Sequence, residues 1–180
     1  GRVQFFSTIA RDISPLKKAQ ESILRQTAIL NGINRIFWEA LTCETEEELG
    51  HSCLAVAQGL TSSRFGFIDI INEQGALDSL AFSDTGWESC RLPAASTPKH
   101  LKNIRPVGLL AKPVLESKTL LTNDPAAHAE AAGLPEGHPP LTAYLGAPLI
   151  SGREPIGLIG LGNKAGGYTD ADREAIEILA

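Results

Sequence analysis

The sequence predicts an α+β domain, with helices covering a face of an antiparallel sheet and one long helix in front. Two observations favour an antiparallel sheet. Apolar runs occur in pairs joined by short turns, as in RFGFIDIINEQGALDSLAF (64–82) and YLGAPLISGREPIGLIGLGNK (144–164), and such pairs form hairpins. Segments with helix start signals stand before and after these hairpins. This order is typical of an α+β domain and not of alternating strands and helices.

Composition excludes several classes of function. The 180 residues are 43% hydrophobic and 21% charged, with a net charge of −5, which is ordinary for a soluble globular protein. There is no cluster of Lys and Arg for nucleic acid and no apolar run of about 18 residues for a membrane span. We therefore expect neither nucleic acid as a partner nor direct membrane contact.

The cysteines indicate a reducing compartment. Cys43, Cys53 and Cys90 are odd in number and widely spaced, without a CxxC pair. This pattern argues against a zinc site and against a disulfide framework. A cytoplasmic location is the expectation that follows.

The first elements are a strand and a long helix. Residues 3–9 are apolar and β-branched, which predicts a strand. Ser14 before Pro15 predicts a helix start with Ser14 as N-cap. Apolar residues then recur at heptad spacing, at Leu16, Ile23, Leu30 and Phe37, with a second seam at Ala19, Ile33 and Ala40 that Gln26 interrupts. A heptad pattern favours pairing with a second copy of the chain, and the alternative is packing on its own domain.

The remaining elements follow in order. Thr45-x-x-Glu48 matches a capping box and predicts a second helix, with an apolar stripe of Leu49, Cys53, Val56, Ala57 and Leu60. The hairpin of 65–71 and 77–82 is followed by an irregular segment, 84–93, and a short helical region, 101–115. A short strand at 119–123 leads to a long connection, 125–140, with a helical piece at 126–132. The second hairpin precedes a final helix that Thr169-x-x-Asp172 caps.

Two families are similar to parts of this sequence. Residues 1–22, GRVQFFSTIARDISPLKKAQES, resemble the end of a PAS domain, where the last strand runs into a signalling helix. Residues from about 30 to 180 resemble a GAF domain, above all in GWESCRLP and in the stretch from TNDPAAHAEAAGLPEGHPPL to the C-terminal helix. The resemblance divides the chain into a truncated PAS strand (1–14), a linker or signalling helix (15–42) and a GAF domain (43–180).

The GAF resemblance implies both a fold and a function. It implies a central antiparallel sheet of about six strands, helices on one face and a ligand pocket on the other. It also implies a non-catalytic sensory domain of a signalling protein such as a sensor histidine kinase, which binds a small molecule, forms a homodimer, or does both. We expect the output domain to lie outside this chain.

The expected pocket lies under two irregular segments, 84–115 and 133–140. The second of them contains GLPEGHPPL, where the family places a lid. Long irregular loops are often functional, and pockets for small molecules are mainly apolar. The candidate ligand contacts are Trp87, Cys90, Leu110, His138 and Tyr144.

Haem is one candidate ligand, because some GAF sensors bind haem through a histidine. His138 would then be the axial ligand, with Cys90 facing the same cavity. Alternatively, His138 is a turn residue whose imidazole bonds to the loop backbone, and Cys90 is a half-buried structural thiol. The sequence lacks the aspartate-proline-histidine contexts of phytochromes, which argues against a bilin.

A second alternative is cyclic-nucleotide binding. NKAGGYTDADRE resembles the asparagine–lysine–phenylalanine–aspartate–glutamate motif of cyclic-nucleotide GAF domains at Asn163, Lys164, Tyr168 and Asp172, but Arg173 replaces the glutamate. The physical interpretation is a structural Lys164–Asp172 pair at the turn between strand and helix. A reductase with a GAF-like fold would need a paired active cysteine motif, which the sequence lacks. We predict that the glycines of 157–162 admit a close helix or ligand.

Overall fold

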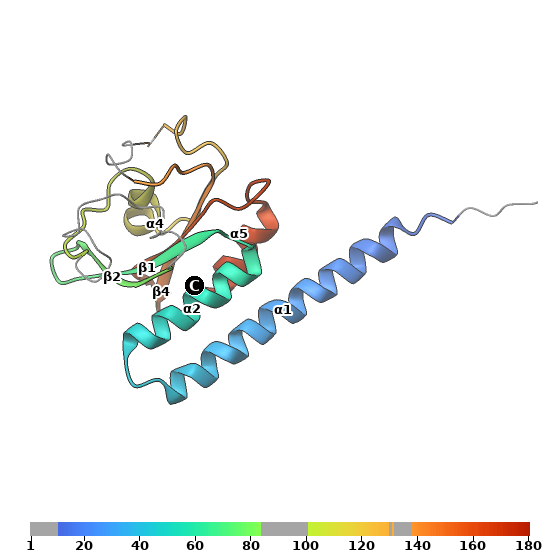
Figure 1. Cartoon of the computed structure of the whole chain (residues 1–180), viewed down its shortest axis with the longest axis horizontal. Helices are drawn as coiled ribbons and strands as arrows, with labels where there is room; N and C mark the ends of the chain where they lie inside the picture. Colours follow the sequence, from blue (N-terminus) through green and yellow to red (C-terminus); the bar gives the residue numbers. More distant parts are fainter. Residues whose placement is uncertain (1–10, 84–100, 130, 132–137) are drawn as a thin grey trace, which may run out of the picture.

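The structure is a computed structural model, and it describes residues 11–83, 101–129, 131 and 138–180. Within these residues the chain forms one five-stranded sheet in the order β2-β1-β5-β4-β3 (Figure 1). All neighbouring strands pair antiparallel, as the hairpins predict. The described part of the sheet thus has one strand fewer than the six or so that the resemblance implied. The strands are β1 (Phe65–Ile71), β2 (Leu77–Phe82), β3 (Leu120–Thr122), β4 (Tyr144–Ser151) and β5 (Glu154–Gly162).

The long helices share one side of the sheet, as expected. α2 packs on β1 and β2, and α5 packs on β4, while α1 lies outside them and contacts both helices (Figure 1). The short η3 and α4 lie against β4 and β5 on the opposite face, so the helices are not confined to one face. These elements are α1 (Ser14–Thr42), α2 (Glu46–Thr61), η3 (Gly108–Leu110), α4 (Ala111–Glu116) and α5 (Asp170–Leu179).

Two apolar clusters fill the two faces of the sheet. The larger one joins the sheet to α2 and α5, and it contains Leu54, Ala57, Ile68, Ala81, Ala143, Leu145, Ala147, Ile159, Leu161, Tyr168 and Ile176. The smaller one lies between the sheet and α4, with Leu77, Val114 and Leu158 buried and Phe67, Ile71, Ile104 and Leu110 partly buried. The apolar stripe predicted for this helix from the sequence did not include Leu54, which is 2% exposed.

Side-chain caps fix the beginnings of α2 and α5. The Thr45 side chain accepts a hydrogen bond from Glu48 N, and Thr169 forms a complete capping box with Asp172. The prediction of Ser14 as the N-cap of α1 is wrong. The helix includes Ser14, and the acceptor is Asp12 Oδ1, 2.9 Å from Ser14 N. An aspartate just before a helix can accept hydrogen bonds from the unpaired backbone N–H groups of the first helical turn, as an N-cap serine would.

Two predicted helical regions are shorter or absent. In 101–115 only the part from Gly108 onward is helical, because Ile104 forms a β-bridge with Leu77, the first residue of β2. The piece expected at 126–132 is a turn in its described residues. There Asp124 Oδ1 accepts from Ala127 N at 3.2 Å, and such side-chain contacts compete with helix formation. The predicted strand at 3–9 and the segment 84–93 lie outside the described residues.

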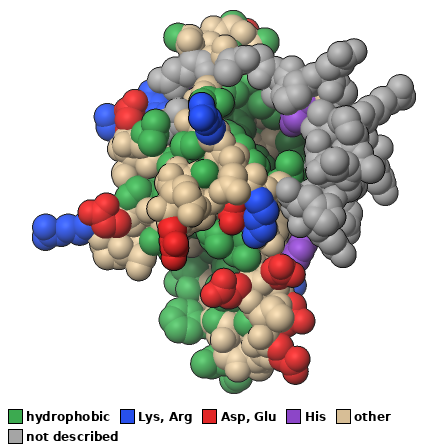
Figure 2. All heavy atoms as spheres, turned by 90° about the vertical axis from the view of Figure 1, so that its left-hand side faces the viewer, with side chains coloured by type: hydrophobic (Ala, Val, Ile, Leu, Met, Phe, Trp, Pro, Cys, Tyr) green, Lys and Arg blue, Asp and Glu red, His purple; other side chains and the backbone are tan. Residues whose placement is uncertain are grey.

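α1 carries two stripes, one toward its own domain and one toward solvent. Ile29 is 7% exposed and Gly32 is buried, where a Cβ would lie 2.6 Å from Val56 Cγ1. The heptad residues instead are 60–70% exposed, namely Leu16, Ile23, Leu30 and Phe37. Figure 2 shows further hydrophobic side chains beside acidic ones at the lower end of the molecule, where α1 turns into α2. None of the helices in the described residues has the length and apolarity to cross a membrane.

Candidate functional site

The candidate site is the sheet face opposite α2 and α5. Cross-strand register defines which residues lie on it. Tyr144, Gly162 and Phe65 stand in one row, Gly146, Gly160 and Phe67 in the next, and Pro148, Leu158 and Asp69 in a third. Directly paired residues lie on the same side of a sheet, and so do residues two apart along a strand. Leu158 and Phe67 belong to the cluster under α4, which identifies this side.

Three glycines form the floor of this face, and each lies under an aromatic ring. A Cβ at Gly146 would meet the Tyr144 ring, one at Gly160 the Phe67 ring, and one at Gly162 the Phe65 ring. The absence of a side chain therefore lets the rings lie close to the backbone. We predicted that glycines here would admit a helix or ligand, and in the structure Gly160 and Gly162 admit the rings.

Tyr144 holds its hydroxyl in a buried position above the glycine floor. The residue is 3% exposed, and its hydroxyl has no hydrogen-bond partner among the described residues. Its ring lies over Gly146, so the hydroxyl extends along β4 toward the row that contains Asp69. Burial and then the charge of Asp69 raise the pKa of Tyr144 above its usual value, which keeps the phenol protonated.

Asp69 places a carboxyl in the same buried region. It is 3% exposed, and burial raises its pKa to about 6, although a hydrogen bond from Ser79 offsets part of the effect and Asp78 adds to it. No Lys, Arg or His side chain of the described residues forms an ion pair with it. The sequence reasoning missed Asp69, although a single carboxyl inside the apolar run FGFIDII was a signal for it.

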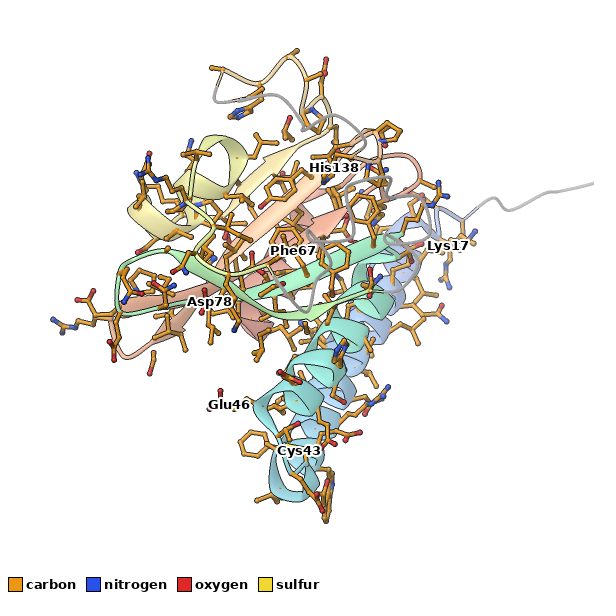
Figure 3. The ribbon with its side chains drawn as sticks, turned by 60° about the vertical axis from the view of Figure 1, so that its left-hand side comes forward. Lys17, Cys43, Glu46, Phe67, Asp78 and His138 are labelled. Atoms are coloured by element: carbon orange, nitrogen blue, oxygen red, sulfur yellow. The ribbon has the colours of Figure 1, made fainter. Side chains whose placement is uncertain are left out.

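The predicted ligand contacts are distributed as follows. Tyr144 and Leu110 lie on this face, and Leu110 packs beside Val114 and Leu158. His138 is half-buried, and its Nδ1 lies 2.7 Å from the Pro139 carbonyl oxygen. Figure 3 shows Phe67 in the middle of the sheet and His138 beyond it, on the side away from Cys43 and Glu46. Trp87 and Cys90 lie outside the described residues, as does most of the expected lid.

A second polar centre lies at the turn from β5 to α5. Lys164 Nζ is 2.6 Å from Asp172 Oδ2, which also accepts from Thr169 N and Oγ1 at 2.9 Å. Burial would raise the pKa of Asp172, but the hydrogen bonds from Lys164 and Thr169 outweigh it and lower the pKa. Arg25 of α1 adds a contact of 3.5 Å to Asp172 Oδ1, and no motif in the sequence predicts this contact.

A groove of about 450 Å3 lies beside this turn. Asn163 and Asn123 line it, and their side-chain amides hold the surrounding loops. Asn163 accepts from Thr142 N and donates to the Pro140 carbonyl, and Asn123 bonds to both backbone groups of Tyr168. This groove is open and is lined by polar and apolar groups alike, and it lies at another place than the apolar cavity predicted under 84–115 and 133–140. That cavity stays a prediction, because much of its expected wall lies outside the described residues.

The described residues contain no group of three or more His, Cys, Asp or Glu side chains placed to hold a metal ion. Haem iron needs only one or two protein ligands, so the absence of such a group does not test a haem bound by His138, which stays a prediction. The part of the site that is described consists of a buried carboxyl, a buried phenol and apolar walls. Its chemistry is suited to binding a small molecule by hydrogen bonds and contact with rings.

Comparison with known proteins gives a family and a fold. A sequence model of the GAF domain matches residues 43–180. The methyl sulfide methyltransferase-associated sensor of Methanosarcina acetivorans is 24% identical over 99% of this chain, which spans only 18% of that protein. The GAF domain of a phosphoenolpyruvate-protein phosphotransferase from Coxiella burnetii superposes with a TM-score of 0.70, at 14% identity, over 85% of this chain and 88% of that one.

A free methionine-R-sulfoxide reductase from Neisseria meningitidis, solved with its substrate, has the same fold. It superposes with a TM-score of 0.64 at 13% identity, over 98% of this chain and 90% of that one. At such identities the structural likeness shows the fold alone. The fold thus occurs in the GAF domain of a phosphotransferase and in a reductase, so the fold by itself does not assign a function.

Proposed function

The chain belongs to the GAF domain family, and on that basis we propose that it is a non-catalytic sensory domain of a longer signalling protein. A small molecule binds on the sheet face opposite α2 and α5, and α1 relays the binding to an output domain such as a histidine kinase. The observation that carries this proposal is α1, which attaches to the domain by one stripe and presents another to solvent.

The exposed heptad stripe supports pairing of α1 with a second copy of the chain. Each of four residues is at least 60% exposed and thus contributes little to the described core of its own domain, namely Leu16, Ile23, Leu30 and Phe37. Burying such side chains against a partner is favourable by about 25 cal/mol per Å2 of apolar surface. In a pair of such helices these side chains would be buried at the seam, and a change in the helix pair could transmit the signal to the output domain.

The contact between Arg25 and Asp172 supports the relay. Asp172 is fixed by the capping box of α5 and by Lys164, so its position follows the β5–α5 turn. Arg25 reaches this carboxylate from α1. A ligand that moves β4 and β5 would therefore act on α1 through a polar contact as well as through α2.

The described cysteines support binding and not reductase chemistry. Cys53 packs against the apolar cluster on the helix side, and Cys43 lies where α1 ends. Burial, with a smaller contribution from Cys43, raises the pKa of Cys53, which suits a structural thiol. Neither thiol belongs to the sheet face that carries Asp69 and Tyr144.

Light scattering tests the proposal through the solution mass. Wild type should have the mass of a dimer, and Ile23→Lys with Leu30→Lys should give a folded monomer, because like charges would face each other in the seam. Ala28→Lys is the matched control, since it adds a lysine at an exposed position away from the stripe. A monomeric wild type at tens of micromolar, or a double variant that stays dimeric, would exclude α1 as the interface.

A further inference from the structure

We infer that Asp69 and Tyr144 recognise the polar end of the ligand, and that this end is a protonated amine on an aromatic or otherwise apolar body. The inference rests on the proposed function, in which this sheet face binds a small molecule. It adds the chemical class of the ligand and the two residues that select it.

The first argument is the hydroxyl of Tyr144. A buried hydroxyl almost always has a hydrogen-bond partner in a native protein. The only other described phenol, that of Tyr168, follows this rule, because its oxygen lies 2.8 Å from Ser63 Oγ. Tyr144 has no such partner among the described residues. Its hydroxyl therefore indicates a hydrogen-bonding group that the described residues do not supply, and we propose that a ligand supplies it.

The second argument is the carboxyl of Asp69. A buried carboxylate is normally paired with a cation, as Asp172 is with Lys164 and Arg25. Asp69 forms no ion pair with a cation among the described residues, and the charge that acts on it, that of Asp78, has the same sign. Within the described residues, the region thus offers a negative charge without a counter-charge.

An ammonium group meets both requirements at once. It carries the missing positive charge and three N–H donors. Asp69 is close enough for its charge to raise the pKa of Tyr144. We therefore place the ammonium in the region between them, where its N–H groups can bond to the Asp69 carboxylate and to the Tyr144 oxygen. A carboxylate ligand would instead face Asp69 with a like charge, and a neutral alcohol would leave the charge of Asp69 unpaired.

The surroundings determine the rest of the ligand. Phe67, Leu110, Val114 and Leu158 belong to the apolar cluster on this face. They suit an aromatic or aliphatic body and leave the polar contacts to Asp69 and Tyr144. This division between an apolar wall and a few polar groups is typical of small-molecule sites.

Three probes with one common ring test the charge of the ligand. Benzylamine, benzyl alcohol and benzoate differ only in the polar end. Added to the full chain at pH 7.5, benzylamine should raise the midpoint of thermal unfolding by about 3 °C at ten times its dissociation constant. Benzyl alcohol should give a smaller shift, and benzoate should give none.

Two variants test the residues. Asp69→Asn should abolish the excess shift of benzylamine over benzyl alcohol, and Tyr144→Phe should reduce it. Asp170→Asn is the matched control, because it removes a carboxylate that is 86% exposed, far from this face, and it should leave the shifts unchanged. Near-ultraviolet circular dichroism of each variant without probe shows whether its core is intact. If Asp69→Asn fails to fold, Asp69→Ser, which is smaller and neutral, replaces it.

The outcomes separate this inference from the proposed function. Equal shifts from benzylamine and benzyl alcohol would overturn the inference that the ligand carries an amine, while they would support binding at this face. If benzylamine still raises the unfolding midpoint of Asp69→Asn more than benzyl alcohol does, the role of Asp69 would be overturned. No shift from benzylamine would overturn the inference as a whole, whereas the part of the proposed function that concerns α1 is decided separately by light scattering.

Discussion

Replacing Tyr144 by Phe should not destabilise the protein, whereas the same replacement at Tyr168 should. Both side chains are 3% exposed, and both changes remove only a hydroxyl. The two hydroxyls differ in their partners. The Tyr168 hydroxyl belongs to a buried series of hydrogen bonds. Its oxygen lies 2.8 Å from Ser63 Oγ, which lies 2.6 Å from Thr61 Oγ1. Tyr144 has no partner among the described residues.

The difference in free energy of unfolding follows from these partners. Breaking the buried bond of Tyr168 costs about 1–2 kcal/mol, because Ser63 keeps only its bond to Thr61. Tyr144→Phe breaks no described bond and removes a polar group from a buried place, so stability should stay the same or rise by up to about 1 kcal/mol. The two variants should therefore differ by about 2 kcal/mol.

Urea unfolding at pH 7 measures this difference directly. The slope against urea should stay the same in wild type and both variants, because neither change alters the surface exposed on unfolding. A loss of more than about 1 kcal/mol in Tyr144→Phe would refute the reasoning. It would mean that the Tyr144 hydroxyl has a stabilising partner in the free protein.

Three further predictions concern charged side chains. Asp69→Asn should raise the free energy of unfolding by up to about 3 kcal/mol above pH 6, because the pKa of Asp69 is raised from 3.8 to about 6. The folded state holds the Asp69 proton more tightly than the unfolded state does. The difference in free energy of unfolding between Asp69→Asn and wild type should therefore grow from pH 4 to pH 6 and then level off. Urea unfolding across this range would contradict the account if that difference stayed constant. Lys164→Ala should cost about 2 kcal/mol, since Lys164 Nζ lies 2.6 Å from an Asp172 side chain that is 1% exposed. Arg25→Ala should cost less than about 1 kcal/mol, since its contact is 3.5 Å long and Arg25 is 35% exposed. Thermal or urea unfolding that ranks Arg25 above Lys164 would be inconsistent with these distances.

Local chemistry explains which elements could be predicted from the sequence. Thr45 and Thr169 cap their helices through bonds to residues three positions away, so a short motif contains the whole interaction. Both hairpins also form between neighbouring segments. The sequence predicts the wrong residue as the N-cap of α1, because Asp12 and Ser14 both suit a helix start and only the folded structure shows that Asp12 supplies the acceptor.

The site depended on information that the sequence does not contain locally. Tyr144 and Asp69 come from strands that do not pair with each other, and β5 between them sets their register. Arg25 and Asp172 are 147 residues apart. α1 holds two overlapping stripes, and the heptad alone could not show that Ile29 and Gly32 would face the domain. Such contacts follow from the packing of whole elements and not from spacing along the chain.

An amide NMR titration with benzylamine tests most directly whether the sheet face opposite α2 and α5 binds ligands. The account predicts that the largest shifts occur at Asp69, Gly146 and Gly160, which line this face, while Ala57 and Ile176 on the helix side stay unchanged. Shifts concentrated in the groove at 163–167, or on the helix side, would contradict it.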